Sequence, residues 1–122
     1  MWKAIVTFGV PEDVVDRLIE ITRDRHANLA RWVVVGTGMQ ALSAMDARWG
    51  SSITLTIVHA SRINASSLSA VLDILDHESL PLGECVWVDA GVMAPMQGKV
   101  FARFISAGEP PSAELILDGL NC

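Results

Sequence analysis

The sequence predicts a single α/β domain over residues 1–122, built as three layers: a four-stranded mixed β-sheet with helices on both faces. Three observations lead to this prediction. The chain has 122 residues, 51% of them hydrophobic, which is enough for one core. Short β-prone runs alternate with helical patterns, which favours parallel strands joined by right-handed crossovers. The last two β-prone runs are separated by only about nine residues, so we expect that pair to be antiparallel.

Four segments rich in Val, Ile, Thr or aromatic residues supply the predicted strands. They are WKAIVTF (2–8), SSITLTIVHA (51–60), ECVWVD (84–89) and KVFARFI (99–105).

Helical periodicity predicts three helices. The first covers residues 11–25, where Pro11 and two acids suit a helix N-terminus and apolar residues recur on one face. The second covers residues 64–79 and opens with cap-forming residues. A final short helix follows the two prolines at 110 and 111.

The segment from His26 to Met45 has a mixed period. We favour one helix over Ala27–Val35 and another over Met39–Met45, with Gly36 and Gly38 as the break between them. The run VVVGTG also fits a short strand that ends in a glycine-rich turn.

Charge and cysteine usage limit the function classes. The net charge is −5, and the nearest approach to a basic cluster is Arg23, Arg25 and Arg31, so tRNA is possible as a partner but disfavoured. Cys85 and Cys122 make no disulfide framework. No apolar run has the length of a membrane span and no export signal opens the chain, so we expect a cytoplasmic protein that does not bind membranes.

The glycines of VVVGTGMQAL invite a phosphate-binding interpretation. They lack the Lys-Ser/Thr of a P-loop and the third glycine of the dinucleotide fingerprint, so we expect packing or a helix break and no cofactor. His26, His59 and His77 lack metal-ligand spacing, so we expect no metal. His59 ends a strand, and it is either a plain strand-end residue or part of a site at the carboxyl edge of the sheet.

Asp89 is the best candidate for a functional residue. It ends the buried strand ECVWVD, where a carboxylate is costly unless it is hydrogen-bonded. Gly91 permits a backbone turn whose N–H groups could bind it. The residue therefore either anchors the loop or takes part in catalysis.

The stretch LPLGECVWVDAGVMAPMQGKVFARFISAGEPPSAELI (80–116) resembles the C-terminal half of the type 2 peptidyl-tRNA hydrolases. The LP turn, the DAG triplet, Gly98, the following strand and the proline-containing loop occur in that family's order. The preceding strand and helix fit the family as well, so the resemblance covers about the second half of the chain.

The resemblance implies catalytic roles for Asp89 and Arg25, and we expect Gly91, Gly98 and Lys99 to bind substrate. The first half departs from the family pattern: Arg25 falls on the family's lysine, Trp32 lies near its histidine, and Met93 replaces a threonine.

We therefore expect a divergent member of the superfamily that binds a small molecule or a protein partner. The alternative is a peptidyl-tRNA hydrolase that cleaves the ester between peptide and tRNA. Because the family is commonly homodimeric, the resemblance also implies a homodimer.

Overall fold

The computed structural model describes residues 2–23, 31–51, 53–90 and 101–121. Its centre is a five-stranded sheet in the order β3-β2-β1-β4-β5, and every neighbouring pair of strands is parallel. The strands are β1 (Ala4–Phe8), β2 (Arg31–Gly36), β3 (Leu55–His59), β4 (Cys85–Asp89) and β5 (Arg103–Ser106).

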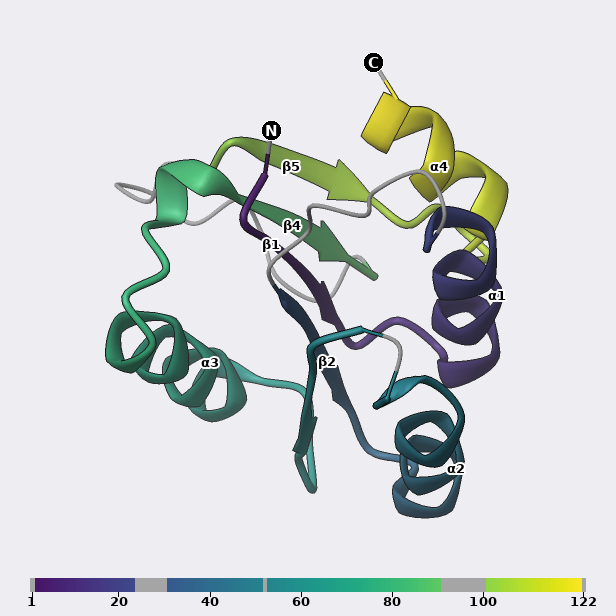
Figure 1. Ribbon diagram of the computed structural model, residues 1–122, viewed down its shortest axis with the longest axis horizontal. Coiled ribbons are helices and arrows are strands. Elements are labelled where there is room, and N and C mark those ends of the chain that lie inside the picture. Colours follow the sequence, from purple (N-terminus) through teal and green to yellow (C-terminus); the bar gives the residue numbers. More distant parts are fainter. Residues whose placement is uncertain (1, 24–30, 52, 91–100, 122) are drawn as a thin grey trace.

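Helices cover both faces of the sheet, as predicted. Helices α1, α2 and α4 lie on one face and α3 lies on the other (Figure 1). Their bounds are α1 (Glu12–Thr22), α2 (Met39–Trp49), α3 (Ala65–His77) and α4 (Ala113–Asn121), and a short 3₁₀ turn, η1 (Leu82–Glu84), precedes β4.

The prediction of a mixed, four-stranded sheet is wrong in two respects. First, β4 and β5 are parallel, with Trp87 opposite Phe104 and Asp89 opposite Ser106. Strand β5 begins four residues later than the β-prone run KVFARFI, so the connection spans residues 90–102. Thirteen residues suffice for a crossover between parallel strands, whereas nine would not.

Second, the predicted helix over Ala27–Val35 is wrong. Residues 31–36 form strand β2, which is the alternative that VVVGTG allowed, and residues 24–30 lie outside the described part. Strand β2 lies between β1 and β3, and the helices on the two faces of the sheet bury five of its six residues, so the continuous apolar run matches an inner parallel strand. The helix predicted over Met39–Met45 is confirmed as part of α2.

The central strand β1 separates two hydrophobic cores. Ile5 contributes to the core beneath α1, α2 and α4, whereas Ala4, Val6 and Phe8 contribute to the core beneath α3. All five residues of β1 are fully buried. This strand therefore holds both layers of helices against one sheet.

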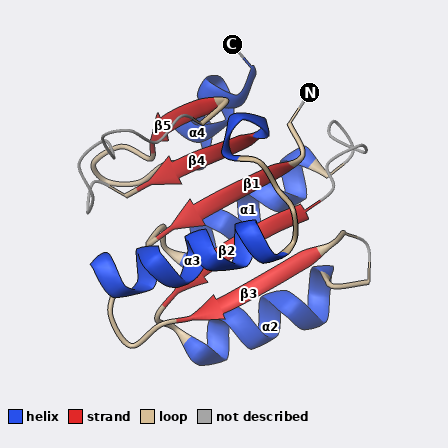
Figure 2. Cartoon of the chain, turned by 90° about the vertical axis from the view of Figure 1, so that its left-hand side faces the viewer, coloured by secondary structure: helices blue, strands red, loops and turns tan. Residues whose placement is uncertain are grey.

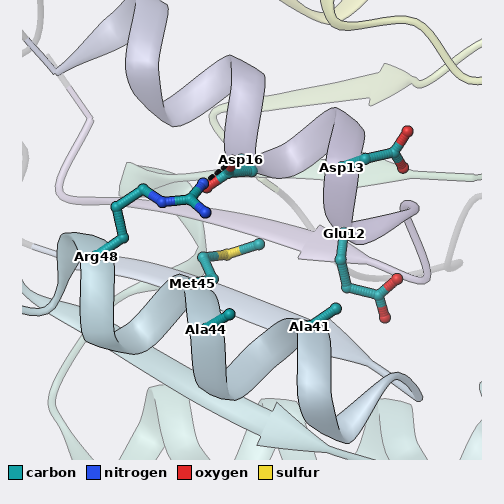
Figure 3. A pocket seen from close by; sticks show the side chains of 7 residues that line it. All are labelled: Glu12, Asp13, Asp16, Ala41, Ala44, Met45 and Arg48. Atoms are coloured by element: carbon teal, nitrogen blue, oxygen red, sulfur yellow. Dashed lines mark hydrogen bonds and ion pairs between the residues drawn. The ribbon is translucent and has the colours of Figure 1, made fainter.

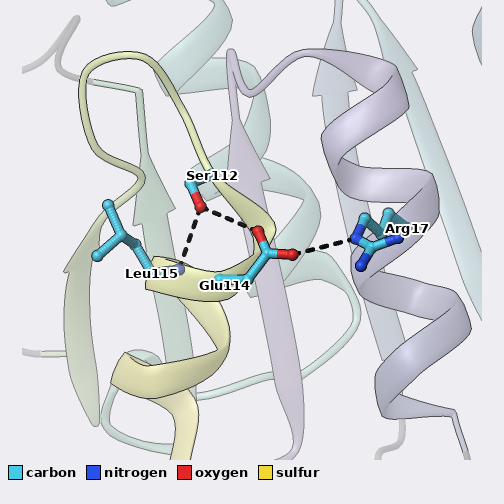
Figure 4. A network of polar contacts seen from close by, with 4 residues as sticks. All are labelled: Arg17, Ser112, Glu114 and Leu115. Atoms are coloured by element: carbon cyan, nitrogen blue, oxygen red, sulfur yellow. Dashed lines mark hydrogen bonds and ion pairs between the residues drawn. The ribbon is translucent and has the colours of Figure 1, made fainter.

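Helix α4 is joined to α1 through Glu114, which lies in the first turn of α4. Its carboxylate accepts a hydrogen bond from the Ser112 hydroxyl (3.1 Å) and pairs with the Arg17 guanidinium of α1 (3.3 Å; Figure 4). The backbone N–H of Glu114, the Ser112 hydroxyl and Arg17 lower the pKa of this carboxyl. Both charged groups are exposed, so this contact orients α4 more than it stabilises the fold.

The N-terminus of α3 is closed by the predicted cap. The Asn64 side chain accepts hydrogen bonds from the backbone N–H groups of Ser66 and Ser67, and the Ser67 hydroxyl accepts one from the Asn64 backbone N–H. Two otherwise orphaned donors of the first helical turn are therefore satisfied.

Replacing Asn64 with alanine is expected to lower the free energy of unfolding by about 1 kcal/mol, because these donors lose their acceptor. Urea denaturation measures the change. Ser66→Ala is the matched control: Ser66 gives only its backbone N–H to the cap, so its effect should stay within about 0.5 kcal/mol. Equal losses in the two variants would contradict the cap.

Candidate functional site

The strand order places a topological switch point between β1 and β4. The chain leaves β1 toward β2 on one side, and β4 lies on the other side of β1 (Figure 2). Connections that diverge from two adjacent parallel strands leave room at their carboxyl ends, where ligands of open α/β sheets bind. Asp89 ends β4 at this point, directly opposite Phe8 of β1.

The Asp89 side chain is almost completely buried, with 2% of the residue exposed. The Trp87 indole N–H donates a hydrogen bond to its Oδ2 atom across 3.4 Å. The Trp87 ring also packs against Phe8 and Phe101, each with a ring-centroid distance of 5.2 Å. Asp89 is thus an acceptor at the rim of an aromatic cluster, on an inner strand as predicted.

The other predicted site residues lie outside the described part of the chain. They are Arg25, Gly91, Gly98 and Lys99.

The glycine-rich turn after β2 already contains an anion, and it comes from the protein itself. The backbone N–H of Gly38, at the N-terminus of α2, donates a hydrogen bond to Oε1 of Glu12 across 3.0 Å. A Cβ atom at Gly36 or Gly38 would lie 2.9 or 2.8 Å from the same oxygen. The glycines therefore make room for a carboxylate at the place where a phosphate-binding loop would hold a phosphate.

Sequence reasoning missed this contact because it attributed Glu12 to the N-terminus of its own helix. The two partners are 26 positions apart. Two sequence features could have predicted this contact: an acid directly after the β1 turn and a Gly-x-Gly directly after β2. Because neighbouring parallel strands end at the same edge of a sheet, these two features must lie close together.

His59 does not join Asp89. It ends the edge strand β3, and strands β2 and β1 separate it from β4. Its Nε2 atom lies 3.1 Å from the backbone oxygen of Thr37. His59 is thus a strand-end residue that contacts the neighbouring turn.

A hollow of about 200 Å³ lies between α1 and α2, with acidic residues at its mouth (Figure 3). One of these, Asp16, is bound by Arg48 and by the Trp49 indole N–H, whose bond to Oδ1 is 2.6 Å long. Two small side chains of α2, Ala41 and Ala44, also line the hollow. The contacts of Asp16 with Arg48 and Trp49 therefore join the two helices beside this hollow.

Cys85 is not a nucleophile in this fold. It starts β4, is fully buried, and its thiol contacts the backbone oxygen of Pro81 at 3.2 Å. Burial, and to a lesser extent the neighbouring Glu84, raise the pKa of this thiol to about 11. The thiolate, which is the reactive form, is therefore rare at neutral pH.

Within the described ranges, no group of three or more His, Cys, Asp and Glu side chains is placed to hold a metal ion. In the same ranges no helix is long and apolar enough to cross a membrane. No protein-family model, curated protein or solved structure matches the chain.

The contact between Glu12 and Gly38 predicts non-additive effects on stability. Glu12→Ala removes the acceptor, and the Cβ of Gly38→Ala would lie 2.8 Å from the same oxygen and displace it, so each should lower the free energy of unfolding by about 1 kcal/mol. In the Glu12→Ala background the second substitution should cost much less, because neither bond nor crowding remains. Chemical denaturation of the four proteins measures this coupling. Asp13→Ala, one residue along α1, is the control for Glu12→Ala. Strict additivity of the effects of Glu12→Ala and Gly38→Ala would contradict the contact.

The raised pKa of Cys85 predicts slow alkylation in the folded state. In a Cys122→Ser background, iodoacetamide at pH 8 should leave Cys85 intact, because only about a thousandth of a thiol with a pKa of about 11 is ionised there. Denaturation in urea should expose the thiol and make it react. Mass spectrometry measures the labelled fraction, and rapid labelling without denaturant would refute the assignment.

Proposed function

We propose that the protein binds a small neutral or cationic molecule at the carboxyl edge of its sheet, with Asp89 as the hydrogen-bond acceptor. The observation that carries the proposal is the position of Asp89: a carboxylate with 2% of its residue exposed, at the end of β4, beside the point where the strand order reverses. A carboxylate at such a point is suited to paired O–H or N–H donors on a ligand.

The charges of the chain favour this ligand class over anions. The net charge is −5, and the Gly36–Gly38 turn, where a phosphate would bind, holds the carboxylate of Glu12. An anionic ligand would meet like charge at both places. A diol, an amine or a guanidinium would instead donate a charge-assisted hydrogen bond to Asp89.

The resemblance to type 2 peptidyl-tRNA hydrolases gives an alternative that uses the same carboxylate. In that case Asp89 would orient or deprotonate the water that attacks the ester. The burial of this carboxylate at a strand end favours such a role, whereas the net charge disfavours tRNA. We therefore keep a divergent, ligand-binding member of that superfamily as the first proposal, in a cytoplasmic setting.

The indole N–H signal of Trp87 provides a direct test, because this group contacts Asp89. We expect this signal to shift in two-dimensional NMR spectra when either of two probes is added. The probes are adenosine, which carries a diol and an amino group, and arginine methyl ester, which carries a guanidinium. The Trp87→Phe variant assigns the signal. Asp89→Asn should weaken binding at least about tenfold, since hydrogen bonds to charged groups contribute about 1.5–3 kcal/mol. Absence of any shift with both probes would count against the site.

Asp76→Asn is the matched control, because it removes the same charge from an exposed position on α3. It should leave the affinity unchanged. Hydrolysis of N-acetyl-aminoacyl-tRNA, measured with the wild type and with Asp89→Asn, decides the alternative. Turnover that disappears with Asp89→Asn would replace the binding proposal with the enzymatic one.

A further inference from the structure

The outer edge of β3 carries backbone groups that no described strand pairs. On the inner side, the Thr54 oxygen accepts a hydrogen bond from the Trp32 N–H (2.8 Å), and the Ala60 N–H donates to the Gly36 oxygen (2.9 Å). Because alternate residues of a strand direct their backbone groups to the same side, the residues between these two contacts alternate between β2 and the open edge. Three residues therefore direct their N–H and C=O groups outward, beyond the last strand of the sheet (Figure 2). They are Leu55, Ile57 and His59.

Nothing in the sequence of β3 protects this edge. The strand reads LTIVH, without lysine, proline or any acid, and four of its five residues are only partly buried. Natural proteins usually protect exposed edges with such residues or with bulges. The opposite edge strand, β5, starts with a cation, Arg103, whose guanidinium donates to the Gly119 oxygen across 2.6 Å.

Open hollows flank β3 on both faces of the sheet. One, of about 330 Å³, lies between β3 and α2, and it is lined by Leu42, Ser43, Asp46 and Ile57. The other, of about 470 Å³, lies between β3 and α3, and it is lined by Thr56, Asp73, Ile74, His77 and Glu78. Successive side chains of a strand point to opposite faces, so a strand added at this edge would direct its side chains alternately toward the two hollows.

Each hollow combines apolar side chains with an available carboxylate. Asp46 of α2 and Asp73 of α3 are exposed, and no cation in the described part of the chain pairs with either. Glu78 is already paired with the Arg31 guanidinium (2.7 Å), which leaves Asp73 as the carboxylate for a ligand on that face. Lys and Arg suit such hollows, because their stems pack on apolar surface while their charged ends reach an acid.

We propose that β3 binds an extended segment of another protein as a sixth strand, and that this segment carries two consecutive basic residues. The backbone of the segment would pair with the outward groups of β3, and its side chains would give specificity. Thr56 and Ile57 are consecutive and line opposite hollows, so the residues across from them point to opposite faces as well. A basic pair at these two positions would reach Asp73 and Asp46.

The charges of the chain favour this partner over an acidic segment and over a second copy. The net charge is −5, so an acidic segment would be repelled. A second copy of β3 could not supply the cations, since LTIVH contains neither lysine nor arginine. Strands β1 and β2 separate this edge from Asp89, so the inference does not depend on the proposed small-molecule site.

Isothermal titration calorimetry with the peptide acetyl-TVKRVT-amide tests the charge requirement. Asp46→Asn and Asp73→Asn should each raise the dissociation constant roughly threefold, and together roughly tenfold, as expected for two independent exposed ion pairs. Glu20→Gln is the matched control, because it removes the same charge from an exposed position on α1, and it should leave the affinity unchanged. No binding of the peptide at millimolar concentration, or an equal loss with Glu20→Gln, would overturn the proposal.

Amide hydrogen exchange, followed by NMR, tests where the peptide lies. The Ile57 N–H should exchange rapidly in the protein alone and at least about tenfold more slowly with saturating peptide, because it gains an acceptor. The N–H groups of Thr56 and Val58, which face β2, should exchange slowly throughout and serve as the internal control.

The peptide acetyl-TPKRPT-amide separates strand pairing from charge attraction. It keeps both cations but replaces two residues of opposite parity with proline, so one donor facing β3 is lost in either register. It should not slow the exchange of the Ile57 N–H. Equal slowing by both peptides, or binding of the first peptide without slowing, would exclude strand addition. Slow exchange of this N–H in the protein alone would show that the edge is already paired, for example by a second copy, and would also overturn the proposal.

Discussion

The position of β1 at the centre of an all-parallel sheet is the constraint on which the rest of the structure depends. Its five residues are fully buried between β2 and β4. Because both neighbours run parallel to it, each must be reached through a crossover, and the crossovers place helices on both faces. The same arrangement brings the ends of β1, β2 and β4 to one edge. Asp89, Glu12 and the Gly36–Gly38 turn all lie there as a consequence.

Local patterns in the sequence predicted most of the elements but not their topology. The β-prone runs before Gly9 and Ala90, the Asn64 cap and the terminal helix were all predicted correctly because each depends on neighbouring residues. Strand β2 was missed because a continuous apolar run fits a buried helix as well as an inner strand. The direction of β5 depended on where that strand begins, and element boundaries are poorly defined by propensity.

The candidate site, too, could be predicted from the sequence only where it depends on neighbouring residues. Asp89 could be identified from sequence because a single acid at the end of an apolar strand is locally conspicuous. Its indole partner, Trp87, lies two residues earlier on the same strand, and because residues two apart on a strand share a face, this neighbour could also have been predicted from the sequence. The bond from Gly38 to Glu12 joins elements 26 positions apart, and it becomes predictable only once β1 and β2 are known to be neighbours. The sequence suggested a phosphate-type turn, but the fold supplies the anion internally.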